Sequence, residues 1–116
     1  MDVAVDPVGG DLAEDALRAL GERGRFLVIG FASGTIPRLP LNQVLLRNRS
    51  VLGVDWGAWA MAHGPDQTAL LDQLLAWVAA GRLHPPAPTT YPLDQVAAAL
   101  DDLTSRRVVG KVVLVP

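Results

Sequence analysis

The sequence predicts an α/β fold in which a short parallel sheet is followed by a separate helix and strand. Two apolar runs, residues 3–5 and residues 26–29, are typical of buried parallel strands. The helical pattern between them makes a strand–helix–strand unit, which joins parallel strands through a right-handed crossover. Small residues follow each run and leave the backbone at the carboxyl ends of the strands open to a ligand.

Composition and charge exclude several classes of protein. With 116 residues, the chain is long enough for one compact domain but not for a second independent core. The net charge is −2, and without a basic patch we expect no nucleic-acid partner. No apolar run approaches the roughly 20 residues of a membrane span, so we expect no membrane partner. The first residues lack the pattern of a secretory signal, which predicts a cytoplasmic location.

No metal site is predicted. The chain contains no cysteine, which excludes disulfides and cysteine-ligated zinc within it. His63 and His84 have no second histidine or carboxylate at metal-ligand spacing. We therefore interpret both histidines as surface residues.

The first strand is expected to cover Val3 to Val5 and to stop at the segment that begins with Asp6, because Pro7 has no N–H for a sheet and the paired glycines that follow favour a turn. Asp11 then begins a helix, with Glu14 at the spacing of a capping box. Leucines and alanines at i, i+4 spacing give this helix one apolar face. The glycines at positions 21 and 24 predict its end.

The second strand runs over residues 26–29. Pro37 and Pro40 predict an extended connector after it, and the apolar residues from Leu41 onward indicate a short helix. The run from Ser50 to Asp55 is then expected to form a third strand at the edge of the sheet.

The remaining chain predicts two helices and a final strand. Asp66 is expected to cap a helix that runs to about residue 80. Residues 83–92 hold four of the nine prolines, which exclude a central strand or a helix and predict a linker. A capped helix from about residue 94 and a strand over residues 110–116 complete the chain. We accordingly divide the chain into residues 1–82 and residues 83–116.

Five short motifs keep an order and spacing that resemble the medium-chain dehydrogenase/reductase superfamily, in particular its zinc-independent quinone oxidoreductase branch. The motifs are Asp6-Pro7-Val8-Gly9-Gly10, Gly30-Phe31-Ala32-Ser33-Gly34, Val54-Asp55-Trp56-Gly57, Tyr91-Pro92-Leu93 and Gly110-Lys111-Val112-Val113-Leu114. The resemblance implies the carboxyl-terminal segment of such an enzyme. Residues 1–82 would then be the second half of a Rossmann-type cofactor-binding domain, and residues 83–116 would return toward a catalytic domain.

The resemblance also implies an activity, which is NADPH-dependent reduction of quinones or activated alkenes. The glycine-rich strand–turn–helix fingerprint that holds a pyrophosphate is absent from this chain. The choice of NADP(H) as cofactor therefore rests on the resemblance alone. Hydride passes directly between nicotinamide and substrate in this family, so no catalytic base or nucleophile is assigned.

The strongest candidates for cofactor binding are Gly30, Phe31, Ala32 and Ser33, which follow the second strand. Their small side chains allow close approach of the backbone, and Phe31 offers an apolar wall. A tight turn without any ligand is the alternative. With the resemblance taken into account, a nicotinamide-binding role is the preferred interpretation.

Four further residues are candidates by position. Pro7 and Val8 follow the first strand and are candidates for the ribose or adenosine side, with a plain strand terminator as the alternative. Trp56 follows the edge strand and is placed near the cofactor by the resemblance, whereas Trp59 suits core or interface packing at least as well. Lys111 offers a charge to a cofactor phosphate, or is an ordinary exposed lysine.

Two hypotheses of function follow. The first is an oxidoreductase segment that contributes the nicotinamide side of the cofactor site to an enzyme acting on a small quinone or enone. The second is a non-catalytic, dimerising half-Rossmann interaction module. Half of the residues are hydrophobic, which predicts a buried sheet or a subunit interface. We expect a homodimer through the edge strand from Ser50 to Asp55.

Overall fold

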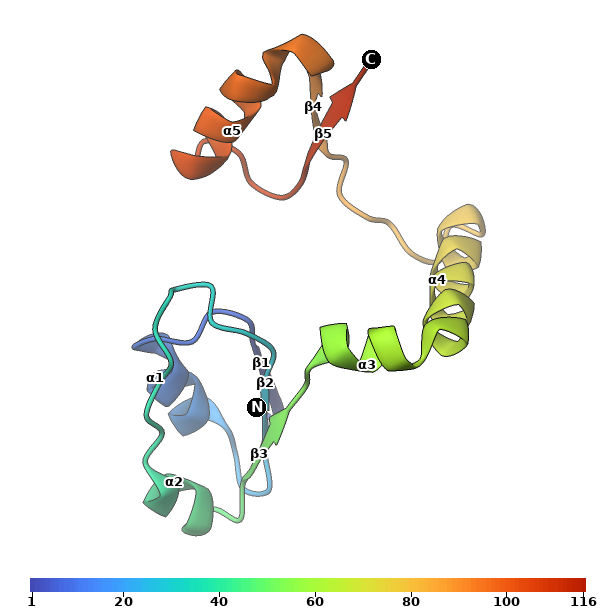
Figure 1. The fold of residues 1–116 in the computed structure, drawn as a ribbon. Helices are drawn as coiled ribbons and strands as arrows, with labels where there is room; N and C mark the ends of the chain where they lie inside the picture. The colour runs from blue at the N-terminus through green and yellow to red at the C-terminus, as the bar shows by residue number, and fades with distance from the viewer. The chain divides into compact units, whose positions relative to one another are not determined.

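The computed structural model describes residues 1–116, which form two compact units, Met1–Gln67 and Thr68–Pro116 (Figure 1). The elements in chain order are β1 (Val3–Asp6), α1 (Leu12–Ala19), β2 (Arg25–Val28), α2 (Leu41–Leu45), β3 (Ser50–Gly53), α3 (Trp56–Ala62), α4 (Gly64–Ala79), β4 (Thr89–Pro92), the 3₁₀ turn η1 (Leu93–Gln95), α5 (Val96–Thr104) and β5 (Val112–Val115). Along the chain, the boundary between the units falls within the residues of α4. The division expected after residue 82 stays a prediction.

The first unit is built on a three-stranded parallel sheet in the order β1-β2-β3. Phe26 in the central strand pairs with Ala4 on one side and with Val51 on the other. The α/β fold and the parallel arrangement predicted from the sequence are therefore confirmed, and β3 lies at an edge as expected.

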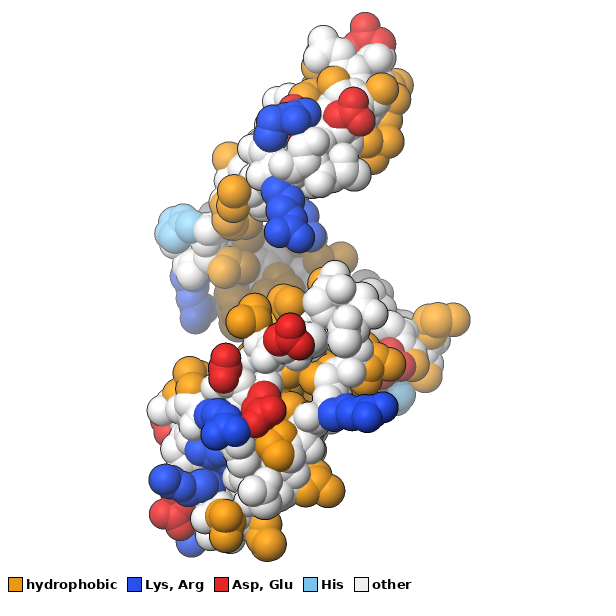
Figure 2. Space-filling model, turned by 90° about the vertical axis from the view of Figure 1, so that its left-hand side faces the viewer, with side chains coloured by type: hydrophobic (Ala, Val, Ile, Leu, Met, Phe, Trp, Pro, Cys, Tyr) orange, Lys and Arg blue, Asp and Glu red, His pale blue; other side chains and the backbone are white.

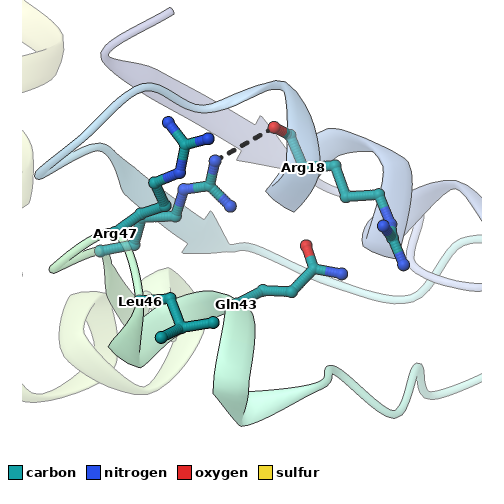
Figure 3. A pocket seen from close by; sticks show the side chains of 5 residues that line it. Arg18, Gln43, Leu46 and Arg47 are labelled. Carbon is teal, nitrogen blue, oxygen red and sulfur yellow. Dashed lines mark hydrogen bonds between the residues drawn. The ribbon is translucent and has the colours of Figure 1, made fainter.

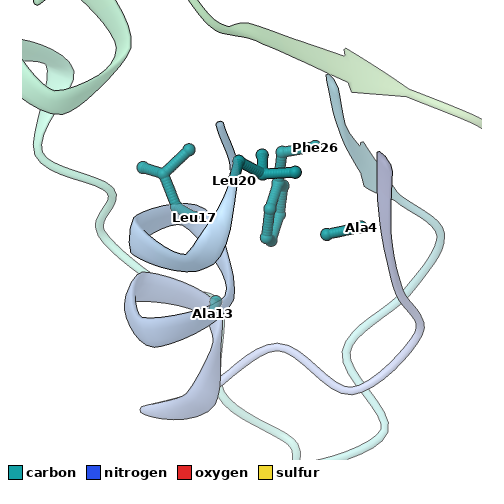
Figure 4. Close-up of a cluster of buried hydrophobic side chains, with 5 residues drawn as sticks. All are labelled: Ala4, Ala13, Leu17, Leu20 and Phe26. Carbon is teal, nitrogen blue, oxygen red and sulfur yellow. The ribbon is translucent and has the colours of Figure 1, made fainter. Parts of the chain in front are cut away.

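The core of the first unit lies between one face of this sheet and α1 (Figure 4). Because side chains alternate along a strand, Ala4 and Phe26 share that face while Val5 points to the other. Leu17 and Phe26 are fully buried, whereas Val5 is 62% exposed. The sheet thus has one covered face and one apolar face without cover within this unit. The core consists of Ala4, Ala13, Leu17, Leu20 and Phe26.

The capping box expected at α1 is wrong. Asp11 has helical backbone angles of φ −68° and ψ −26°, and its side chain accepts no capping hydrogen bond. An N-cap side chain needs extended backbone to reach back to the first turn, so Asp11 is in the wrong conformation for the role. Glu14 instead accepts a hydrogen bond from Arg18 at 2.5 Å, one helical turn later.

The other end of α1 is closed by Arg49, which precedes β3. The Arg49 guanidinium donates to the carbonyl of Gly21 at 3.3 Å, to that of Arg18 at 3.1 Å, and to that of Leu20. Figure 3 shows the bond to the Arg18 carbonyl. Terminal carbonyls of a helix lack partners within the helix and carry partial negative charge, so a buried cation there satisfies both needs.

The second unit contains a small parallel β–α–β arrangement. Thr89 in β4 pairs with Val112 in β5, and α5 connects the two strands. The expectation that residues 83–92 form only a linker is therefore wrong for residues 89–92. Pro92 is tolerated because it ends a strand in a two-stranded sheet, where no inner neighbour needs its N–H.

Two helices also differ from expectation. Helix α3 was not predicted, and its first turn is capped by Asp55, whose carboxylate accepts the N–H of Ala58 at 3.0 Å. Helix α4 begins at Gly64, so Asp66 lies in its first turn and does not cap it. No side chain of α4 is buried, and its leucines are exposed. Figure 2 shows hydrophobic side chains on the surface of the molecule. None of the helices is long and apolar enough to cross a lipid bilayer.

Candidate functional site

A hollow of about 670 Å³ lies at the carboxyl ends of β2 and β3. It is open at the surface and its wall is mainly apolar. Carboxyl ends of parallel strands are the usual place for ligands in open α/β sheets, because the loops there diverge. The hollow is lined by Val28, Ile29, Gly30, Phe31, Gly53, Val54, Asp55, Trp56 and Gly57.

The structure brings three of the predicted site residues together around this hollow. Gly30 and Phe31 come from the loop after β2, and Trp56 from the first turn of α3. Phe31 is 40% exposed and Trp56 is 49% exposed, so both rings offer surface to a ligand. The lining of the hollow therefore includes one aromatic ring from the loop after β2 and one from the start of α3.

The backbone around the hollow is kept thin by residues without side chains. A Cβ added at Gly53 would meet no atom within 4 Å, and one added at Gly30 would lie 3.5 Å from the Pro7 carbonyl oxygen. A small side chain would therefore fit sterically at either position. The glycines thus leave room for a flat ligand against the main chain.

An aromatic row runs along α3 from the hollow. The ring centroids of Trp56 and Trp59 are 4.8 Å apart with the planes tilted by 32°, and those of Trp59 and His63 are 5.0 Å apart and nearly parallel. Trp59 also lines an adjoining hollow of about 440 Å³ with Trp56. Trp59 was not among the predicted cofactor residues, although its helical i, i+3 spacing from Trp56 was a usable signal.

Pro7 and Val8 lie beside the loop that follows β2, and neither lines the hollow. The Pro7 carbonyl accepts the N–H of Ala32 at 3.0 Å, and the Val8 carbonyl accepts the N–H of Ser33 at 2.9 Å. The predicted site residues after β1 and β2 therefore form one hydrogen-bonded layer. Ala32 and Ser33 take part through their backbone rather than by lining the hollow.

Lys111 lies in the second unit, directly before β5. Its carbonyl accepts the N–H of Thr89 at 2.9 Å and so begins the pairing of β4 with β5. This backbone role is independent of the side-chain charge. A phosphate-binding role for Lys111 stays a prediction.

Asp6 is the polar residue in this region that sequence analysis missed. It is only 9% exposed, and its Oδ1 accepts the N–H groups of Val8 and Gly9, each at 2.9 Å. The sequence signal was the Asp-Pro-X-Gly pattern, which is typical of a turn held by an aspartate side chain.

A second hollow, of about 270 Å³, lies at the opposite end of the sheet (Figure 3). Two of its three arginines already have structural partners. Arg49 is bound to the carbonyls at the end of α1, and Arg18 is paired with Glu14 at 2.5 Å. The arginines here serve mainly to join α1 to the turn before β3. Its lining is Arg18, Gln43, Leu46, Arg47 and Arg49.

One polar cluster lies in the second unit. The Tyr91 hydroxyl donates to Asp102 at 2.5 Å, and Arg107 donates to the same carboxylate at 2.6 Å. The bond from Tyr91, followed by that from Arg107, lowers the pKa of Asp102 below its ordinary value. The same bond to Asp102 raises the pKa of Tyr91. The cluster fastens β4 to the end of α5. No group of three or more His, Cys, Asp or Glu side chains could hold a metal ion.

Comparison with known proteins places this arrangement in a family. The family model for zinc-binding dehydrogenases matches residues 1–114. A curated relative, quinone oxidoreductase-like protein 2 of Bos taurus, is 38% identical over 98% of this chain and 33% of its own length. This chain thus spans about a third of the length of that relative.

Two solved structures show the same fold. A quinone oxidoreductase of Pseudomonas syringae pv. tomato matches with a TM-score of 0.75 and 28% identity, over 99% of this chain and 35% of that one. A mycobacterial protein in complex with NADPH matches with a TM-score of 0.82 and 23% identity, over 100% of this chain and 35% of that one. At this identity the second likeness shows the fold alone.

Proposed function

The chain belongs to the zinc-binding dehydrogenase family of the medium-chain dehydrogenase/reductase superfamily, and on that premise we propose that it forms the nicotinamide side of the cofactor site in an NADPH-dependent oxidoreductase. The substrate we propose is a quinone or an activated alkene. The observation that carries the proposal is the apolar hollow at the carboxyl ends of β2 and β3, with Phe31 and Trp56 on its sides.

The hollow suits a nicotinamide ring. Its lining is mainly apolar, two aromatic side chains flank it, and Gly30 and Gly53 leave space beside the backbone. A flat ring that packs between apolar walls needs few polar partners, and main-chain groups at the strand ends can supply them. The mycobacterial structure that shares this fold holds NADPH, the cofactor we propose here.

The rest of the cofactor fits less well. A pyrophosphate is usually held at a helix N-terminus, where backbone N–H groups point at the anion. Helix α1 carries Glu14 and Asp15 in its first turn, and Asp11 stands directly before it. These carboxylates would repel a phosphate group. The residues of this chain therefore fit the nicotinamide end of the cofactor, and we do not assign them to the pyrophosphate.

Within this proposal the chain positions reactants and performs no covalent step. A bound reduced nicotinamide supplies the hydride directly to the substrate, which removes the need for a protein nucleophile. Phe31 and Trp56 hold flat rings and exclude water from the space between them, while the glycines permit close approach of the ring to the main chain. The aromatic row that continues to Trp59 offers a surface for a planar acceptor beside the cofactor.

A second candidate function is a dimerising interaction module without catalysis. The observation that favours it is the exposed apolar surface of the edge strand and the helix after it. Val51 and Leu52 of β3 are 39% and 44% exposed, and Met61 of α3 is 91% exposed. An edge strand with unpaired backbone groups beside apolar side chains favours association.

Both functions include the homodimer through β3 that the sequence predicts. Light scattering of the purified chain at micromolar concentration tests it, and a monodisperse monomer would contradict it. The cytoplasmic location predicted from the sequence is likewise carried into the proposal.

The size of the native product separates the two functions. We propose an immunoblot of source-cell extract with an antibody against this chain, beside the purified 12.3 kDa chain as standard. The oxidoreductase function requires a band about three times heavier, because a two-domain enzyme needs that length. The precipitated product should then oxidise NADPH when 1,4-benzoquinone is added.

A band at the size of the standard, without turnover in the precipitate, would instead favour the interaction module. For the purified chain alone we expect no turnover of 1,4-benzoquinone and only weak affinity for NADPH, since the pyrophosphate site is lacking. Calorimetry that gives a micromolar dissociation constant, lost in Lys111→Ala, would contradict this part of the proposal.

A further inference from the structure

The loops after β1 and β2 form one layer because their backbones are joined by hydrogen bonds beyond the ends of the strands. Beyond the ends of the two strands, N–H groups of the second loop donate to carbonyls of the first strand and loop. One further N–H, in the first loop, donates to a carbonyl near the end of the second loop. The bonds run from the N–H of Ile29 to Asp6 at 2.9 Å, of Ala32 to Pro7 at 3.0 Å, of Ser33 to Val8 at 2.9 Å, and of Gly10 to Thr35 at 3.0 Å.

The side chain of Asp6 fixes the first of these loops. It is buried, and no lysine or arginine forms an ion pair with it. Burial of a carboxylate is costly unless hydrogen bonds compensate it. Here Oδ1 accepts the N–H groups of Val8 and Gly9, each at 2.9 Å. Hydrogen bonds to an ionised acceptor are stronger than neutral ones, so these two bonds hold the loop in one conformation.

The conformation that Asp6 holds brings Gly9 against the second loop. Gly9 has a φ of +67°, and a Cβ built on it would lie 2.8 Å from Cδ1 of Phe31 and 2.9 Å from the carbonyl oxygen of Thr35. Contacts this short mean that the bare backbone of Gly9 lies directly against the Phe31 ring. The loop that Asp6 holds therefore limits where the Phe31 ring can lie.

Phe31 is one wall of the hollow at the carboxyl ends of β2 and β3. We propose that Asp6 is a positioning residue of the nicotinamide site, which acts through Gly9 to set the place of the Phe31 ring. The inference rests on the proposed function, since it assigns the hollow to a nicotinamide. Asp6 does not line the hollow itself, so its effect on a ligand must pass through the two loops.

The matched variants are Asp6→Ala and Asp6→Asn, with Asp11→Ala as control. Asparagine keeps the Oδ1 acceptor for both N–H groups and loses only the charge, whereas alanine loses the acceptor. Asp11 is a nearby carboxylate whose side chain makes no capping hydrogen bond, so its removal changes the charge without releasing the loop.

Two measurements on the full chain test the proposal. The first is the affinity for reduced nicotinamide mononucleotide, read by nuclear magnetic resonance from the Gly30 amide and the Phe31 ring. This ligand carries the nicotinamide end without the pyrophosphate bridge. The second is the hydrogen exchange of the Val8 and Gly9 amides, with the amide of buried Leu17 as a measure of intact folding.

We expect Asp6→Ala to weaken the binding at least about tenfold and to speed exchange at Val8 and Gly9 by a similar factor, because both amides lose a charged acceptor. Exchange at Leu17 should stay unchanged. Asp6→Asn should recover binding to within about threefold of the parent chain, since the acceptor geometry is retained. Asp11→Ala should bind like the parent chain.

Binding by Asp6→Ala that equals the parent chain would overturn the proposal. So would equally weak binding by Asp6→Asn and Asp6→Ala with Leu17 still protected, because the acceptor would then not be the cause. If the parent chain itself gives no shift at Gly30 and Phe31, the proposed function fails, and the inference falls with it. Faster exchange at Val8 and Gly9 in Asp6→Ala would then show that the loop is held as described but serves another purpose.

Discussion

The two units contain the same motif, a pair of parallel strands joined by a helix, yet they differ in what that motif buries. In the first unit α1 covers the sheet, and Leu17 and Phe26 are completely buried. In the second unit Ala99 is the only buried residue of α5, while Leu100 beside it is 56% exposed. The unit with a third strand therefore has a core of its own, whereas the unit with two strands does not.

The polar links between elements follow the same division. The first unit uses Arg49, which is 9% exposed, to hold the end of α1, and the second uses the half-buried pair of Tyr91 and Asp102. A polar link that water reaches contributes less to stability than a buried one, because water competes for the same groups. The first unit should thus be rigid enough to hold a site, and the second should gain order from its surroundings.

The largest expected effect is that of Phe26→Ala. Removal of a fully buried aromatic ring from a small core should cost about 3–5 kcal/mol of unfolding free energy, enough to unfold most of the first unit. Leu100→Ala in the second unit should cost less than about 1 kcal/mol, since the side chain is already half exposed. Chemical denaturation, with hydrogen exchange at Leu27 and Val113 to report each unit, measures both. Equal losses would contradict the difference between the units.

Arg49→Ala should cost about 2 kcal/mol, because three carbonyls at the end of α1 lose a charged donor in a buried place. Arg47→Ala is the matched control. Arg47 lines the same hollow from an exposed position on the same turn, and its loss should stay within about 0.5 kcal/mol. Thermal unfolding of both variants gives the comparison, and a similar cost for the two would show that Arg49 does not cap the helix.

Asp55→Ala should cost about 1 kcal/mol, because α3 loses the side chain that caps it. Asp11→Ala at the start of α1 should cost less than about 0.5 kcal/mol, since no capping bond is lost there. Comparison of the two variants distinguishes an aspartate that caps a helix from one that precedes a helix without capping it. A greater cost at Asp11 than at Asp55 in urea unfolding would reverse this assignment.

The smallest effect concerns the polar link in the second unit. In Tyr91→Phe the pKa of Asp102 should rise toward its ordinary value, because the hydroxyl that lowers it most is lost while Arg107 remains. A lowered pKa in the folded state means that the link stabilises the unit above the ordinary aspartate pKa and is lost as the pH falls through the lowered one. The raised pKa of Tyr91 sets the upper limit, since the link is lost as the pH rises through it.

Carboxyl nuclear magnetic resonance of Asp102 follows this titration in both proteins. The same Asp102 pKa in the parent chain and in Tyr91→Phe would mean that Arg107 alone governs it. The link would then contribute nothing to joining β4 with α5.

The sequence allowed the parallel sheet to be predicted because its strands are apolar runs and a helical pattern lies between the first two. The predictions of helix caps were wrong, because aspartate occurs both at N-caps and inside the first turn of helices. Aspartate is a residue type that often caps helices, but Asp11 and Asp66 both have helical backbone and cap nothing. Asp55 is the aspartate whose side chain caps a helix. Residues 89–92 form a strand although they include Pro92. The proline is tolerated because the sheet has only two strands, and the sequence alone does not show that number.

The candidate site could be predicted in part. Gly30, Phe31 and Trp56 line one hollow, as expected of residues that follow neighbouring parallel strands, although their role with a cofactor stays a prediction. Asp6 could not be assigned from the sequence, because its contribution depends on how close two separate loops lie. Packing was at least as good an interpretation for Trp59, since the helix that places its ring against Trp56 was not predicted.

The most direct test of the central claim is to map where the chain meets reduced nicotinamide mononucleotide at millimolar concentration, by nuclear magnetic resonance of the nitrogen-labelled protein. The account predicts shifts confined to the amides of residues 30–33 and 53–57 and to the indole of Trp56, with none at Arg47 across the sheet. Shifts centred on the arginine hollow, or no shift at residues 30–33, would contradict the claim that the carboxyl ends of β2 and β3 form a nicotinamide site.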